Sequence, residues 1–226
     1  MRLVAVSDAS LLPFDEPGHA GDACPDRPAR APCKKLVVAL LVALFAVMAS
    51  PAGATVRGLS KRDITVRHIP SSCPGADLQP TEKDLGRIRA ATVCLVNRER
   101  AGHGERPLAP NERLEQAAQA HTESMAFGDY LEHDGPRGAT PLSRMRASGY
   151  ISNSQISHEV GENIGWGTLW EATPRAIVAA WMASPRHRAN IVDARFRDTA
   201  VGVSPHPPSS LARGQAGAIY TQDFSG

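Results

Sequence analysis

The sequence predicts an α+β fold, because helical patterns come first in the folded region and extended patterns come mostly late. An order of this kind is typical of domains in which helices pack against a small antiparallel sheet. The chain has 226 residues, of which 42% are hydrophobic, and no internal repeats. This length and composition fit one globular domain with additional N-terminal sequence.

Four helices are predicted from residues that can cap a helix N-terminus and are followed by apolar side chains at helical spacing. The predicted capping residues are Thr81 (in a capping-box variant), Asn111, Thr140 and Thr173. A further short helix is expected to begin at Ser184, with Pro185 in its first position. Gly128 is expected to end the second helix.

Three segments have extended patterns and are predicted to be strands or, for the first, an extended turn. They are Val160 to Trp166, Ala200 to Val203, and Ala218 to Phe224. The first is rich in glycine, which indicates a backbone path where side chains would not fit. The last two are separated by a predicted loop, Pro205 to Gly217.

The N-terminal part has the pattern of a secretion signal. Lys34 and Lys35 precede an apolar run over residues 36–49, and an Ala-Gly-Ala site follows at 52–54. We expect cleavage near Ala54 and no stable membrane span afterwards, since a span needs about 20 apolar residues. Residues 1–33 fit either a start codon assigned upstream, which we favour, or an extended n-region. The predicted organisation is a leader and signal over 1–54, a flexible arm over 55–80, and a folded domain over 81–226.

Two cysteines remain after the predicted cleavage, Cys73 and Cys94. An even pair in an exported domain predicts a disulfide joining the arm to the first helix, and the alternative is two buried free thiols. The net charge of +2 argues against a nucleic-acid partner.

Several short motifs occur in a fixed order along residues 84–226. They are Val96-Asn97-Arg98-Glu99-Arg100, Leu114 to His121, Leu131-Glu132-His133, Gly161-Glu162-Asn163-Ile164, Ala180-Trp181-Met182 with Ser184 to Ile191, and Tyr220 to Phe224. Together they resemble the CAP superfamily, also called the SCP domain, in its bacterial secreted branch. The resemblance implies an α-β-α sandwich with a three-stranded antiparallel sheet. It also implies a cleft lined by two His and two Glu, which binds divalent metal in some members and sterols or fatty acids in others.

The resemblance places two of these four cleft residues at His133 and Glu162, whereas Ser184 and Ile219 occupy the other two positions. His187 lies near in the motif and is a candidate replacement, so His133, Glu162 and His187 form a candidate site for zinc with an open position for water. The alternative is that Glu162 and Asn163 belong to a buried hydrogen-bond network without a ligand. His121 lies on the apolar face of its helix, which favours a hydrogen-bonded core residue over a ligand, and the sequence leaves open whether it joins the cleft.

Three functions remain compatible with the sequence. The favoured one is a secreted, monomeric binding module for a small ligand, a lipid or a divalent metal. The alternatives are a metal-dependent hydrolase and a non-catalytic domain that binds a cell-envelope component. We do not expect Ser184 to act as a nucleophile, because it lacks an elbow motif and is better explained as a helix cap.

Overall fold

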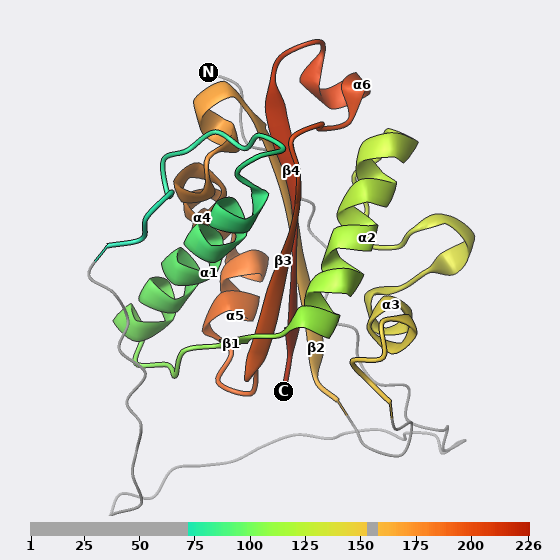
Figure 1. Cartoon of the computed structure of the whole chain (residues 1–226). Coiled ribbons are helices and arrows are strands. Elements are labelled where there is room, and N and C mark those ends of the chain that lie inside the picture. The colour runs from blue at the N-terminus through green and yellow to red at the C-terminus, as the bar shows by residue number, and fades with distance from the viewer. Residues whose placement is uncertain (1–71, 153–157) are drawn as a thin grey trace, which may run out of the picture. The chain divides into compact units, whose positions relative to one another are not determined.

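The computed structural model describes residues 72–152 and 158–226. The predicted leader, the signal and residues 55–71 of the predicted arm lie outside this part of the chain. Within it, helices and one sheet form three layers, so the α+β prediction is confirmed (Figure 1). No helix in this part is both long and apolar enough to cross a membrane.

The sheet has four strands, in the order β1-β3-β4-β2. Their bounds are β1 Ala109–Pro110, β2 Val160–Thr168, β3 Asp198–Ser204 and β4 Gly217–Ser225. β4 runs antiparallel to both of its neighbours, β2 and β3, while β1 pairs in parallel with β3. The expected count of three strands was wrong, since β1 is a fourth. β1 has only two residues and contains a proline, which is rare inside strands, so no sequence pattern predicts it.

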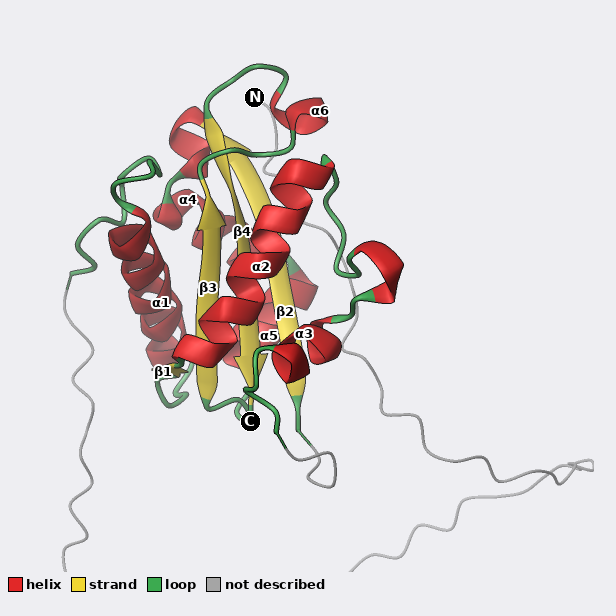
Figure 2. Cartoon of the chain, turned by 45° about the vertical axis from the view of Figure 1, so that its right-hand side comes forward, coloured by secondary structure: helices red, strands yellow, loops and turns green. Residues whose placement is uncertain are grey.

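Helices cover both faces of the sheet (Figures 1 and 2). α1 (Leu85–Gly102), α4 (Pro174–Ala183) and α5 (Pro185–Val192) lie on one face. α2 (Glu112–Gly128) and α3 (Pro141–Ala147) lie on the other. The short helices η1 (Pro136–Gly138), η2 (Leu169–Ala172) and α6 (Ser209–Ala212) lie in connections, and α6 falls inside the segment predicted as a loop.

The predicted caps explain where three of the helices begin. The Asn111 side chain accepts hydrogen bonds from the backbone NH groups of Arg113 and Leu114. Thr140 and Thr173 cap α3 and α4 in the same way. α2 ends at Gly128, as predicted, and α1 begins at Leu85 after a turn over residues 82–84.

β2 separates two different environments because successive side chains of a strand point to opposite faces. Ile164 points toward α2 and packs with Met125 and Ile219. Gly165 points the other way, where an added Cβ would lie 3.0 Å from Nε1 of Trp181. At Gly167 an added Cβ would come within 2.3 Å of the backbone oxygen of Glu171. The glycines of this strand therefore allow close packing of helices on the α4–α5 face.

Cys73 and Cys94 form the predicted disulfide, with their Cα atoms 5.7 Å apart. The bond attaches residues 72–80 to α1, and this segment also accepts a 2.9 Å backbone hydrogen bond from Arg175 at Ala76. Cys73 and Ala76 are buried. Residues 72–80, which we expected within the flexible arm, thus pack on the folded domain.

Candidate functional site

The carboxylate of Glu162 is the centre of a buried polar cluster on the α2–α3 face of the sheet. Nδ1 of His133 lies 2.7 Å from Oε1, and Nη2 of Arg144 donates to Oε2 at 2.5 Å. β2 directs Glu162 to this face, the loop after α2 supplies His133, and α3 supplies Arg144. We call Glu162, His133, Arg144, His121 and Asp223 the Glu162 cluster. The first three form a hydrogen-bonded set, with an ion pair between Arg144 and Glu162, that joins a loop and a helix to the sheet.

Glu162 is held in its ionised form although its side chain is only 2% exposed. Burial alone would raise its pKa. The hydrogen bond from His133 and the charge of Arg144 outweigh burial, so the pKa of Glu162 is below its usual range. Arg144 is fixed in turn, because its Nη1 donates to the backbone oxygen of Ala139.

His121, whose place in the core or the cleft the sequence left open, is buried and forms the α2 side of the cluster. Its Nε2 lies 2.9 Å from the carbonyl oxygen of Glu132 and 3.9 Å from Oε1 of Glu162. A carbonyl oxygen only accepts, so Nε2 carries the proton and donates. Burial lowers the pKa of His121 to about 4, although the Glu162 charge opposes this shift. The imidazole is therefore neutral at neutral pH.

Asp223 faces Glu162 directly, because these two residues are paired across β4 and β2. It is fully buried, and neither of its carboxyl oxygens has a hydrogen-bond partner among the described residues. Burial and the nearby Glu162 charge raise the pKa of Asp223 well above its usual range. The cluster thus contains two carboxyl groups whose environments push their pKa values in opposite directions.

His187 does not join this cluster, so the predicted ligand set of His133, Glu162 and His187 is not assembled. Asn163 follows Glu162 in β2 and points to the opposite face of the sheet. Its Nδ2 donates to the backbone oxygen of His187 at 3.2 Å. His187 therefore lies on the α4–α5 side of the sheet, where its Nδ1 is 2.7 Å from Oγ of Ser184. Among residues 72–152 and 158–226, no group of three or more His, Cys, Asp or Glu side chains could hold a metal ion.

A second, neutral network lies on the opposite face. Nδ2 of Asn190 donates to Oδ1 of Asn163 at 2.9 Å and to the backbone oxygen of Glu162 at 3.1 Å. Nε1 of Trp181 donates to the backbone oxygen of Ile164 at 3.1 Å. The Gly-Glu-Asn motif is thus divided, since Glu162 enters the charged cluster and Asn163 the neutral network.

Sequence reasoning did not identify Arg144 or Asp223 as members of the site. Arg144 is one of several arginines in its helix region, and Asp223 is one residue of the motif Tyr220 to Phe224, whose face toward the cleft was not assigned. A period of two could have grouped Asp223 with Thr221, but the pairing register with β2 could not be known from sequence. Ile219, in the position of the missing family His, packs with Ile164 and Met125 instead.

The fold and the cluster together define a three-layer α-β-α domain with a buried glutamate–histidine pair on the central sheet. Residues 93–224 match the model of the CAP family, described as the cysteine-rich secretory protein family. This match covers more than half of the 226 residues, and the chain belongs to that family.

Similar proteins come from several bacteria. The chain is 34% identical to the uncharacterized protein YkwD of Bacillus subtilis over 135 residues, which are 59% of this chain and 45% of that protein. It therefore spans less than half the length of this relative. An extracellular SCP-domain protein from Bacillus anthracis matches in structure with a TM-score of 0.48 and 23% identity, over 64% of this chain and 43% of that one. An outer surface protein from Borrelia burgdorferi gives a TM-score of 0.48 and 16% identity, over 66% and 97%.

Proposed function

We propose that the chain is a secreted, non-catalytic binding module that recognises a small ligand at the surface edge of the Glu162 cluster. The observation that carries this proposal is the engagement of both Glu162 carboxylate oxygens by His133 and Arg144. Each carboxylate oxygen keeps a second lone pair, but the Glu162 side chain is held by two partners and is only 2% exposed, so a substrate has little access to it. This arrangement favours binding over catalysis.

The part of the cluster nearest the surface is formed by the two partners of Glu162 and not by Glu162 itself. The side chains of His133 and Arg144 are 11% and 10% exposed, whereas that of Glu162 is 2% exposed. Arginine pairs well with planar or tetrahedral oxyanions because its NH groups form a fixed fork. The ligand class supported is therefore a small molecule with a carboxylate or phosphate group, which includes fatty acids and lipid headgroups.

The residues present do not fit a zinc site. Three protein ligands are the minimum in known catalytic zinc sites, and His133 and Glu162 supply two. His187 lies across the sheet, and Nε2 of His121 donates to Glu132, so it offers no lone pair at that atom. The metal-dependent hydrolase considered from the sequence therefore lacks support from this geometry.

Ligand binding is tested with protein purified from culture medium by native mass spectrometry, followed by titration with short carboxylates, phosphate monoesters and Zn²⁺. We expect one anionic probe to bind and Arg144→Lys, which removes the fork, to weaken it about tenfold. The matched control is Arg146→Lys, an exposed arginine two residues later. Equal affinity of the anionic probe for wild type and the Arg144→Lys variant contradicts the proposal. Micromolar zinc binding that His133→Ala abolishes favours the metal alternative.

Secretion is supported by the Cys73–Cys94 disulfide, because such bonds persist in oxidising compartments. The basic and apolar segments before Ala54 support it independently. N-terminal sequencing of the exported protein should give Thr55 or a near neighbour as the first residue. An exported protein that retains residues 1–54 would contradict the cleavage expected near Ala54.

A further inference from the structure

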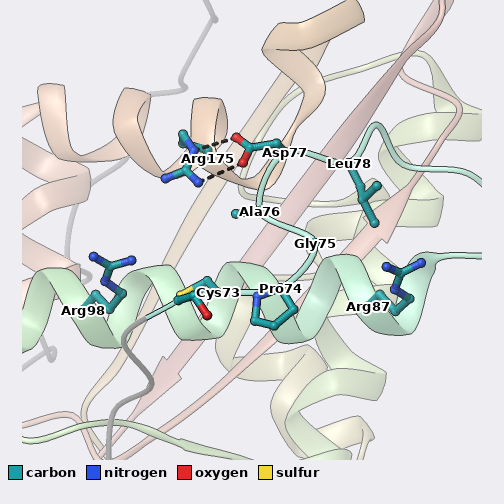
Figure 3. A pocket seen from close by; sticks show the side chains of 10 residues that line it. Cys73, Pro74, Gly75, Ala76, Asp77, Leu78, Arg87, Arg98 and Arg175 are labelled. Carbon is teal, nitrogen blue, oxygen red and sulfur yellow. Dashed lines mark hydrogen bonds and ion pairs between the residues drawn. The ribbon is translucent and has the colours of Figure 1, made fainter.

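A depression of about 470 Å³ lies where residues 73–78 cross α1, on the face of the sheet opposite to the Glu162 cluster (Figure 3). Its lining includes the apolar residues Pro74, Ala76 and Leu78 and the disulfide-bonded Cys73. Three arginines, Arg87, Arg98 and Arg175, also line it, and Asp77 is the one acid among the described residues of its wall. The depression therefore combines positive charge with apolar lining residues.

The helical period explains why two of the arginines share this wall. Arg87, Cys94 and Arg98 are spaced by seven and four residues in α1, and these spacings place all three on one face of a helix. The disulfide to Cys94 holds residues 73–78 against that same face. Figure 3 shows Pro74 between Arg87 and Arg98 along the helix.

The third arginine fixes the segment from the other side. Nε and Nη2 of Arg175 donate to the two carboxylate oxygens of Asp77 at 2.6 and 2.9 Å. This pairing lowers the pKa of Asp77 and neutralises the wall's acid. The disulfide and the backbone hydrogen bond from Arg175 to Ala76 thus hold the depression in shape before any ligand binds, which reduces the ordering cost of binding.

The two arginines of α1 are free to pair with other molecules to different degrees. Arg87 forms an exposed ion pair with Asp84 at 3.1 Å, a contact that is worth little in water. Arg98 is exposed and has no ion pair or hydrogen bond among the described residues. Their positions are separated by 11 residues, or about 16 Å along the helix axis. A single carboxylate or phosphate is too small to contact both.

From this spacing we propose that the depression is a docking site for an acidic peptide segment of a partner protein. Successive side chains of an extended peptide point to opposite sides, and each residue rises about 3.3 Å. Acidic side chains four positions apart therefore lie on the same side, about 13 Å from one another, a separation that the long side chains of Arg87 and Arg98 can reach. The residues between them would lie over Pro74 and the apolar lining residues. The site lies in a different layer from the proposed ligand edge of the Glu162 cluster, and neither proposal depends on the other.

The test is fluorescence anisotropy with the secreted chain and a labelled synthetic peptide in which three uncharged residues separate two aspartates. We expect this peptide to bind more tightly than an isomer with adjacent aspartates. Arg98→Gln should weaken it about fivefold, the upper range for one exposed ion pair. Arg146→Gln removes the same charge from an exposed position on α3 and should leave the affinity unchanged.

Three outcomes would overturn the proposal. Equal affinity for the two peptides would remove the spacing argument. An equal loss in the Arg98→Gln and Arg146→Gln variants would show general attraction to a basic protein. Displacement of the peptide by inorganic phosphate at the same concentration as the peptide would show a simple anion site. Both variants alter exposed side chains, and circular dichroism checks that they fold.

Discussion

On the α2–α3 face of the sheet Glu162 is buried as an ion with Arg144 and His133, whereas on the α4–α5 face Asn163 and Asn190 are buried as neutral amides. The two arrangements start from adjacent residues of one strand. A neutral network keeps its hydrogen bonds at any ordinary pH, but the charged cluster depends on the protonation of several groups. The comparison indicates that the hydrogen bonds of Asn163 and Asn190 provide constant stability, while the Glu162 cluster can respond to pH and to a charged ligand.

The neutral face can be broken most strongly at Trp181, which is fully buried and donates to the backbone of Ile164. We expect Trp181→Ala to lower the free energy of unfolding by about 4 kcal/mol, since it leaves a large cavity and an unpaired carbonyl. Urea unfolding should give the same loss at pH 5 and pH 7. The control is the exposed Trp170, where alanine should cost less than about 0.5 kcal/mol. A loss of unfolding free energy that depends strongly on pH would contradict the expectation that the hydrogen bonds around Trp181 involve neutral groups.

The Glu162→Gln variant disrupts the Glu162 cluster, because it removes the counter-charge of a largely buried Arg144. Breaking such a pair costs about 3 kcal/mol at pH 7. Because the pKa of Glu162 is lowered, its contribution is present above the ordinary value of 4.5 and is lost as pH falls further. The difference between wild type and variant should therefore shrink in acid. Glu159→Gln, at an exposed ion pair with Arg195, should cost at most about 1 kcal/mol.

The His121→Gln variant tests how much of the pH dependence of stability comes from His121. Unfolded histidine binds a proton below about 6.5, whereas burial lowers the pKa of His121 to about 4. The unfolded state is thus favoured as pH falls from 6.5 to 4, and stability drops by up to about 3 kcal/mol. The variant should lose this part of the pH slope in urea unfolding. His206→Gln, at an exposed histidine, should retain it; equal slopes in wild type and His121→Gln would show that His121 does not titrate as described.

Local signals were sufficient for most of the fold. Asn111, Thr140 and Thr173 cap helices as predicted, because a cap depends on residues within one turn. The three longer strands have visible extended patterns, but β1 is defined by its partner β3, about 90 residues later in the chain. No local pattern reveals a strand that exists only through such pairing.

The site was predicted less completely because its members come from distant elements. The resemblance placed His133 and Glu162 in one cleft, and the structure shows them in contact. It could not place His187, since motif spacing does not tell which face of a sheet a later helix covers. Asp223 required the β2–β4 register, and Arg144 required the position of α3, and both are products of tertiary packing.

The smallest expected effect, and the finest test of the difference between the faces, is at Asp223. Its raised pKa means that the folded state holds a proton which the unfolded chain releases above about pH 4, so this group destabilises the fold as pH rises. Asp223→Asn keeps the shape, carries no charge at any pH and offers Glu162 an NH donor. We expect the variant to be more stable than wild type by about 1 kcal/mol at pH 7, with a smaller gain at pH 5. Asp134→Asn, at an exposed aspartate, should change neither value. A loss of stability at pH 7 would mean that Asp223 is buried as an ion, and the two carboxyl groups of the cluster would then both be charged.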